Sequence, residues 1–273
     1  MPNGANSGAA GSNRREARAD LYYWRLVATA LSFVLFGLGQ LVLGILVFPF
    51  VRLWPRGRTG YETRTRSFLR HSFRLFIWFM RLVGLLTYDF RGADRLGRPG
   101  QLIIANHPSL IDVVFLLGFV PGANCVVKRG LWRNPFTMFA VIGAGYVSNL
   151  PTQEMIEGAD AALRDRQCVI MFPEGTRTRP GQPLYFHRGS ANVAVRAASA
   201  VTPVYIRVEP SALTKAAPWY RIPLRRPHFS LRVGDDIAVV PFRELASVPA
   251  GSRAFNSELL AVFTGELGPG SPN

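Results

Sequence analysis

The chain has 273 residues, of which 48% are hydrophobic and 18% are charged, so intrinsic disorder is excluded as a description of the whole chain. Two cysteines exclude both a disulfide scaffold and a cysteine-based zinc module. The 32 Lys and Arg residues against 17 Asp and Glu residues give a formal net charge of +15. Such an excess favours an acidic partner, which leaves nucleic acid, anionic lipid and a phosphorylated substrate as candidates.

The N-terminal third of the chain contains most of the basic excess and the strongest apolar segments. Residues 1–20 are rich in Gly, Ala, Asn, Ser and Arg without an apolar period, which predicts a disordered tail. Residues 26–48 carry no charge, and a helix of about 23 residues is about 35 Å long, enough to cross a bilayer. A single span and a re-entrant segment both remain open, with residues 37–40 as the expected place for a bend. A membrane is therefore a better partner than nucleic acid, for which the sequence has no motif.

A second apolar stretch, residues 67–86, differs from the first because cationic side chains interrupt it. These are Arg66, Arg70, Arg74 and Arg81. At about 100° per residue they fall within an arc of about 80°, which predicts an amphipathic helix in the membrane plane with its arginines among anionic headgroups. The alternative is a helix that faces the core of a soluble domain. Together, residues 21–86 are predicted to be membrane-anchoring helices.

After residue 86 short apolar runs alternate with helical stretches, which is typical of α/β architecture. The predicted fold for residues 87–273 is a mixed, mostly parallel sheet flanked by helices. Strands are predicted at residues 87–91, 101–106, 125–128, 146–148, 168–172, 203–208 and 229–233. Helices are predicted at residues 110–119, 132–142, 153–166, 188–199 and 252–264. Cys125 and Cys168 fall in predicted strands, so we expect inert, buried thiols in a reducing compartment.

One histidine lies where a buried strand ends, at His107-Pro108. In an open α/β sheet ligands bind at the carboxyl ends of the strands. Asp112 follows in the first turn of the next helix, where its carboxylate can turn back, fix the imidazole tautomer and stabilise the imidazolium. The spacing leaves two alternatives open. His107 can be purely structural, and Ser109 with Asp112 fits a variant of the helix capping box.

A second group of polar residues follows the strand predicted at 168–172. After Pro173 the sequence continues with Glu174, Gly175, Thr176 and Arg177. Glycine allows a ligand to approach the backbone closely, and arginine offers a planar fork to phosphate or carboxylate. An ordinary strand-to-turn junction is the alternative for this pattern taken alone.

Together the two groups resemble motifs of the glycerolipid acyltransferase superfamily. Asn-His-Pro-Ser-Leu-Ile-Asp at 106–112 and Phe-Pro-Glu-Gly-Thr-Arg at 172–177 match the N-H-x-x-x-x-D and F-P-E-G-T-R blocks of its bacterial lysophosphatidate acyltransferases. The likeness covers about residues 85–210, including Val127-Lys128-Arg129, and the family's N-terminal helices match the two apolar segments. It implies transfer of a fatty acyl group from an acyl-CoA or acyl-carrier-protein thioester to the hydroxyl of a lysolipid, in phospholipid biosynthesis.

The resemblance also implies a role for each matching residue. His107 acts as general base oriented by Asp112, while Lys128 and the residues of the second block bind substrate. These are Glu174, Gly175, Thr176 and Arg177, with Arg177 as the phosphate or headgroup contact. The tetrahedral oxyanion is stabilised by backbone N–H groups or by Lys128, and the sequence leaves this choice open. No covalent intermediate is needed, although Ser109 is a remote alternative nucleophile. Neither a metal nor a cofactor is expected besides the thioester co-substrate.

One departure concerns the acceptor. Asn149 is neutral at the end of a strand where relatives with phosphate-bearing acceptors often carry a cation. A lyso-ornithine lipid, a lysophospholipid with a larger headgroup and a polyene lipid therefore stay open as acceptors. The rival functions are a membrane-bound hydrolase and a non-catalytic lipid-binding protein. We expect a bacterial inner-membrane enzyme with its catalytic domain facing the cytoplasm, membrane lipids as partners and no nucleic acid, and the oligomeric state stays open.

Overall fold

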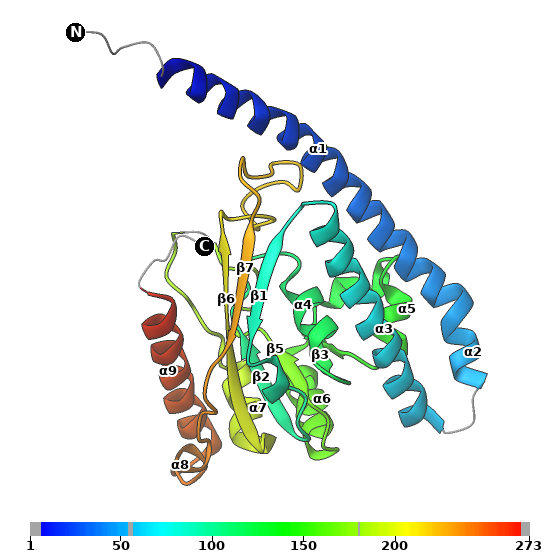
Figure 1. Cartoon of the computed structure of the whole chain (residues 1–273). Helices are drawn as coiled ribbons and strands as arrows, with labels where there is room; N and C mark the ends of the chain where they lie inside the picture. The colour runs from blue at the N-terminus through cyan, green and yellow to red at the C-terminus, as the bar shows by residue number, and fades with distance from the viewer. Residues whose placement is uncertain (1–6, 54–56, 180, 269–273) are drawn as a thin grey trace.

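The computed structural model describes residues 7–53, 57–179 and 181–268. Its centre is a seven-stranded sheet with helices on both faces, flanked by a long N-terminal helix (Figure 1). The strands are β1 (Thr87–Arg91), β2 (Gln101–Ala105), β3 (Asn124–Val127), β4 (Val147–Ser148), β5 (Val169–Met171), β6 (Ala200–Glu209) and β7 (His228–Val233). All seven predicted strands are present, with bounds that differ from the predicted ones by at most a few residues.

The sheet has the order β1-β7-β6-β2-β5-β3-β4. All neighbouring strands are parallel except β6 and β7, so β1 and β7 run opposite to the other five. The predicted mixed, mostly parallel sheet is confirmed. The carboxyl ends of β2, β3, β4, β5 and β6 therefore share one edge, which we call the carboxyl edge.

Two hydrophobic cores lie on the two faces of the sheet. Alternate residues of β2 divide between them, because Ile103 and Ala105 belong to one core and Leu102 and Ile104 to the other. Burial on both faces explains why the strands are continuous apolar runs. The first core is closed by helices α3 (Gly57–Leu82), α4 (Asp112–Phe119) and α5 (Met138–Gly143). The second is closed by α6 (Thr152–Arg164), α7 (Arg188–Ala197) and α9 (Val248–Leu267), with α8 (Val240–Arg243) beside α9.

The N-terminal helix is longer than predicted. Helix α1 covers Ser7–Val42, a π-helical turn covers Leu43–Val47, and α2 covers Phe48–Leu53. Helix α1 therefore begins within residues 1–20, for which the sequence predicted a disordered tail, and extending an existing helix through Ala- and Arg-rich sequence costs little. Residues 1–6 lie outside the described residues. The irregularity expected at 37–40 occurs instead in the π-helical turn, where Gly44 meets Phe139 of α5.

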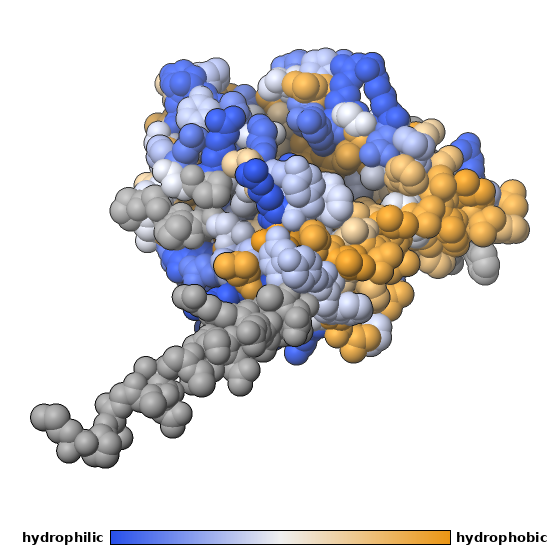
Figure 2. Space-filling view, turned by 90° about the horizontal axis from the view of Figure 1, so that it is seen from above, coloured by the Kyte–Doolittle hydropathy of each residue, from blue (hydrophilic) through white to orange (hydrophobic). Residues whose placement is uncertain are grey.

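Within the described residues, Tyr22–Leu53 is the one helical stretch long and apolar enough to cross a membrane. One side of it packs on α3, where Phe36 stacks on Phe73 with ring centroids 5.8 Å apart. Its other side exposes a row of large apolar side chains, seen as a hydrophobic band in Figure 2. The row comprises Val27, Leu31, Val34, Leu35, Leu38, Val42, Ile45, Leu46, Phe50 and Leu53. This arrangement supports association with a membrane.

Helix α3 corrects the prediction for the arginine stripe. Arg66 is 5% exposed and donates to Ala144 O at 2.7 Å and to Gln167 Oε1 at 2.8 Å. Arg74 and Arg81 lie over the rings of Phe119 and Tyr88. The stripe therefore contacts the α/β domain, because carbonyl oxygens and aromatic faces there accept the guanidinium groups. Besides polar side chains such as Arg74 and Arg81, α3 exposes large apolar ones, namely Phe68, Leu75, Trp78 and Leu82.

Candidate active site

Asn106 fixes the point at which the chain leaves the sheet. Its Nδ2 donates to Ile206 O and its Oδ1 accepts from Ile206 N, both at 2.8 Å, so the side chain extends the pairing of β2 with β6 beyond the end of β2. His107 follows directly and therefore lies at the carboxyl edge, as the sequence predicted.

Asp112 lies beside the His107 imidazole. The distance from His107 Nδ1 to Asp112 Oδ2 is 2.9 Å, and Asp112 is fully buried. The same oxygen accepts the backbone N–H of Ser109 at 2.6 Å. Burial raises the pKa of Asp112, whereas the hydrogen bonds from His107 and Ser109 oppose that rise. One carboxylate thus forms both the capping-type bond and the imidazole bond, which were alternatives at the level of sequence.

The imidazole is held on a second side by an aromatic ring. The ring centroids of His107 and Phe172 are 4.5 Å apart, and the His107 side chain is 16% exposed. With Nδ1 bonded to Asp112, Nε2 is the nitrogen left for a substrate. Ser109 Oγ is buried and has no hydrogen-bond partner among the described residues. Its backbone, not its hydroxyl, is engaged by Asp112.

Glu174 lies under the His107 backbone. Its Oε1 accepts the N–H of His107 at 2.9 Å and the hydroxyl of Thr178 at 2.8 Å. Thr178 N in turn donates to His107 O at 2.7 Å. Burial raises the pKa of Glu174, and the two hydrogen bonds oppose the rise. Sequence reasoning missed Thr178, whose only signal was a second hydroxyl two residues after Thr176.

Arg177 joins the turn after β5 to the connection between β6 and β7. Its Nη1 donates to Leu213 O at 2.8 Å and to Thr214 O at 3.0 Å. Leu213 O also accepts Leu110 N at 3.1 Å. Among the described residues, Nε and Nη2 of Arg177 form no hydrogen bond, so that part of the fork is open to a ligand. No pattern in the sequence indicates that Leu213 and Thr214 belong to the site.

Gly175 and Thr176 are exposed beside these residues at the carboxyl edge. Gly175 adopts a left-handed backbone with φ +64°, which disfavours any other residue. A Cβ atom at this position would lie 3.2 Å from His187 Cδ2. The glycine therefore permits both the turn and the close approach of His187.

Lys128 and Asn149 lie at the ends of β3 and β4 on the same edge. The Lys128 side chain is exposed, and its ammonium group forms no hydrogen bond or ion pair within the described chain segments. Asn149 Oδ1 accepts the backbone N–H of Arg129 at 3.0 Å. The neutral residue that departs from the family pattern thus holds the turn that carries Lys128 and Arg129.

The remaining groups to consider are the two cysteine thiols and the side chains that could bind a metal ion. Cys125 and Cys168 are buried, and burial raises the pKa of both thiols, that of Cys168 to about 12. Neither thiol ionises near neutral pH. Within residues 7–53, 57–179 and 181–268, no cluster of three or more His, Cys, Asp or Glu side chains is arranged to hold a metal ion.

Comparison with known proteins identifies the domain. Residues 87–207 match the family model described as Acyltransferase. A 1-acyl-sn-glycerol-3-phosphate acyltransferase of Pseudomonas aeruginosa is 28% identical over 184 residues, which cover 65% of this chain and 70% of that protein. The protein of the same name from Saccharomyces cerevisiae is 29% identical over 143 residues, which cover 49% of this chain and 47% of that protein.

The fold has a counterpart among solved structures. The crystal structure of the 1-acyl-sn-glycerophosphate (LPA) acyltransferase PlsC from Thermotoga maritima matches with a TM-score of 0.63 and 20% sequence identity, covering 89% of this chain and 97% of that one. Residues 87–207, which include His107 and Asp112, therefore match an acyltransferase domain, and the chain shares the fold of the T. maritima structure. These comparisons support the resemblance to the glycerolipid acyltransferase superfamily that residues 106–112 and 172–177 carry.

Proposed function

We propose that this acyltransferase moves a fatty acyl group from an acyl-CoA or acyl-carrier-protein thioester to the hydroxyl of a lysophosphatidate-type acceptor, in phospholipid biosynthesis. The observation that carries the proposal is the 2.9 Å bond between His107 Nδ1 and the buried Asp112 carboxylate. The names of the relatives from P. aeruginosa and S. cerevisiae support the acceptor class.

In this proposal His107 is the general base and Asp112 orients it. Asp112 accepts a hydrogen bond from Nδ1–H. Nε2 therefore takes the proton of the acceptor hydroxyl as the hydroxyl oxygen attacks the thioester carbonyl. The tetrahedral intermediate collapses with cleavage of the C–S bond. The departing thiolate, whose thiol has a pKa of about 8.5, recovers the proton from the imidazolium. No covalent enzyme intermediate is needed, which fits the high pKa of both buried thiols.

Substrate binding is assigned to the exposed groups of the same edge. The unbonded Nε and Nη2 of Arg177 offer a charged fork for the phosphate of the acceptor. Lys128, Gly175 and Thr176 complete this surface, with Lys128 or backbone N–H groups stabilising the oxyanion. Glu174 differs, because its buried carboxylate is bonded to His107 N and Thr178, which supports a positioning role.

A second acceptor class is favoured by Asn149. Its amide replaces a cation that relatives with phosphate-bearing acceptors often have, and its Oδ1 is already bonded to Arg129 N. A lyso-ornithine lipid, a lysophospholipid with a larger headgroup or a polyene lipid is the corresponding alternative acceptor. Hydrolysis of the thioester is a further alternative, in which water replaces the acceptor alcohol.

The location proposed for the enzyme follows from its substrates and its apolar helix. Both lipids are insoluble, so a site at a bilayer surface avoids their transfer into water. The exposed apolar row of Tyr22–Leu53 supports attachment to a membrane. We propose the cytoplasmic membrane of a bacterium, with the catalytic domain on the cytoplasmic side where acyl thioesters are made.

The test is acyl transfer by the full chain in mixed micelles. Labelled acyl-CoA and acyl-carrier protein are each offered with lysophosphatidate, other lysophospholipids and lyso-ornithine lipid, and the product is identified by mass spectrometry. We expect labelled phosphatidate, and loss of about 10²–10⁴-fold of the rate with His107→Ala. Transfer only to another acceptor selects the second class. Free fatty acid release that ignores every acceptor overturns the transferase proposal.

A further inference from the structure

The connection between β6 and β7, residues 210–227, combines cationic and aromatic side chains. It contains no Asp or Glu, but it carries Lys215, Arg221, Arg225 and Arg226 together with Trp219 and Tyr220. The connection follows the carboxyl end of β6, so it lies at the same edge as His107. In Figure 1 it is the yellow-to-orange segment beside α1.

Direct contacts join this connection to the apolar N-terminal helix. The ring of Trp219 packs edge-on against Phe33 of α1, with centroids 5.8 Å apart. Leu224 O accepts a hydrogen bond from Arg25 Nη2 of α1 at 2.6 Å. These contacts place the connection directly beside the helix that exposes the apolar band in Figure 2.

The same connection is tied to the candidate active site at its other end. Leu213 O and Thr214 O both accept from Arg177, the proposed headgroup contact. Residues 210–227 therefore contact both helix α1 and the candidate active site. Lys215 and Arg221 lie between these contacts along the chain, and Arg225 and Arg226 follow Leu224 directly.

The polar and apolar side chains of the segment are available to a partner. Lys215, Arg221, Arg225 and Arg226 are exposed, and none of them forms an ion pair in the part of the chain that is described. Trp219, Tyr220 and Leu224 are 46%, 53% and 75% exposed. Tryptophan and tyrosine favour the headgroup level of a bilayer, and each cation near an anionic surface contributes about 1 kcal/mol of attraction.

We propose that residues 210–227 form a second membrane contact that binds anionic lipid headgroups, separate from the apolar face of α1 and α3. The occupant is a bilayer surface with negatively charged lipids. An acidic protein would also be attracted by four cations, but it would not explain the exposed Trp219 and Leu224 next to the apolar band. The inference rests on membrane association and not on the choice of acyl acceptor.

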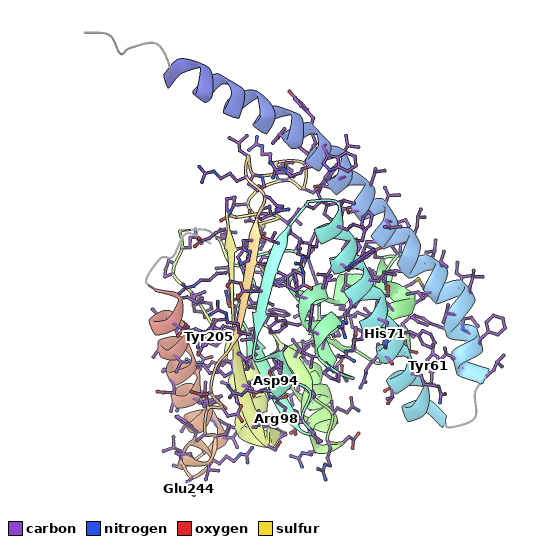
Figure 3. All side chains as sticks on the ribbon, viewed as in Figure 1. Tyr61, His71, Asp94, Arg98, Tyr205 and Glu244 are labelled. Carbon is purple, nitrogen blue, oxygen red and sulfur yellow. The ribbon has the colours of Figure 1, made fainter. Side chains whose placement is uncertain are left out.

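The test measures contact at a single labelled position. Both native cysteines are buried, so Leu224→Cys places one environment-sensitive fluorophore on the connection of the full chain. Glu244→Cys provides the control label, because Glu244 lies at the end of the molecule far from α1 (Figure 3). Each protein is reconstituted in phosphatidylcholine vesicles with or without about 30 mol % phosphatidylglycerol, and quenching by spin-labelled lipid is recorded.

Charge variants separate the basic residues from the apolar helix. Arg225→Gln with Arg226→Gln removes two charges from the connection. Arg166→Gln with Arg253→Gln removes two exposed charges outside it. We expect quenching at Leu224→Cys to be at least about twofold stronger with phosphatidylglycerol, to fall at high salt, and to lose this dependence only in the first double variant.

Three outcomes overturn the proposal. Quenching that is equal in the two vesicle types shows that α1 alone sets the contact. Absence of quenching at Leu224→Cys in both vesicle types shows that the connection does not touch the bilayer. Protection of the label by acyl-carrier protein, without an effect of phosphatidylglycerol, assigns the basic surface to an acidic protein. None of these readouts depends on catalysis, so failure of the proposed activity would be seen separately.

Discussion

Glu174 Oε1 accepts the backbone N–H of His107 at 2.9 Å, so the turn after β5 holds the second residue beyond β2. The two strands are neighbours in the sheet. This bond joins the two sequence blocks of the site, and the buried carboxylate has a second partner in Thr178. The contact supports a positioning role for the Glu174 side chain.

Comparison of Glu174→Gln with Glu174→Ala is predicted to separate the hydrogen-bonding role of Glu174 from the effect of its negative charge. Glutamine keeps an oxygen that can accept both hydrogen bonds, so we expect kcat within about tenfold of wild type. Alanine leaves His107 N and Thr178 without their acceptor and displaces the imidazole, so kcat falls by about 100-fold. Steady-state kinetics with a constant acceptor KM would support this. Equal loss in the two variants would show that the negative charge itself acts on substrate.

Asp112→Asn is predicted to remove the charge that supports the imidazole while keeping its hydrogen bond. Asp112 Oδ2 accepts from both His107 Nδ1 and Ser109 N–H, so the amide oxygen of asparagine can take this place and the amide NH₂ takes that of Oδ1. The neutral amide no longer stabilises the imidazolium that forms when Nε2 takes the proton of the acceptor hydroxyl. We expect kcat to drop at least about 100-fold with little change in the fold. Adding His107→Ala to this variant should cost little more, and a second full loss would mean that the two residues act independently.

Arg177→Met tests the headgroup contact. Methionine keeps the volume but removes the fork and its bonds to Leu213 O and Thr214 O. We expect the acceptor KM to rise by about tenfold or more while the donor KM is unchanged. A lowered melting temperature with an unchanged acceptor KM would show that Arg177 is only a structural tie.

Gly44→Ala tests how closely the N-terminal helix packs against α5. A Cβ at Gly44 would lie 2.4 Å from Phe139 Cβ, whereas a Cβ at Gly39 would have no neighbour within 4 Å. We expect Gly44→Ala to destabilise by about 1–3 kcal/mol and Gly39→Ala to be neutral or stabilising. Thermal unfolding in detergent micelles measures both. Similar melting temperatures for the two variants would contradict this packing.

Asp236→Asn is predicted to destabilise the protein in a pH-dependent way. The hydrogen bond from Arg98 at 2.7 Å holds the pKa of Asp236 below its usual value. Because the folded protein favours the ionised carboxylate, this stabilisation is present above the ordinary Asp pKa of about 3.9 and is lost as the pH falls below it. At pH 7 we expect a loss of at most about 1 kcal/mol, since the pair is partly exposed.

The melting temperature as a function of pH, with a neighbouring residue as control, checks this expectation. Asp235→Asn alters a fully exposed carboxylate paired with Arg95, so it should leave the melting temperature unchanged. The deficit of Asp236→Asn should disappear in acid. A deficit that persists at low pH would mean that the amide disturbs packing instead of removing a charge. Arg98 lies at the lower end of the sheet in Figure 3, so the test does not perturb the site.

The strands were predictable because the central ones are buried on both faces and form uninterrupted apolar runs. The helix predicted at 132–142 is instead a 3₁₀ turn at Arg129–Arg133 and α5 at Met138–Gly143, because Asn134-Pro135 interrupts the helical backbone. The four-residue helix α8 has no periodic pattern and was missed. The contacts of the arginine stripe could not be predicted, because local composition does not reveal what a helix packs against.

The site was predictable only where its contacts are local. His107 and Asp112 are five residues apart, and a strand end followed by a helix start brings them together. The partners of Arg177 belong to the connection after β6, more than thirty residues later, and they are backbone carbonyls that any residue type carries. Glu174 and His107 were both selected, but their direct bond depends on the strand order.

The buried side of α3 limits how the catalytic half can be isolated. Leu69, Phe73 and Ile77 are buried in the same core as α4, where a Cβ on Gly118 would contact the α3 backbone at 3.3 Å. A fragment that starts at Thr87 would lack α3. It would therefore expose the apolar surface of α4 to water and would aggregate. A soluble form of this enzyme therefore requires polar substitutions on the exposed faces of its first helices, not truncation of these helices.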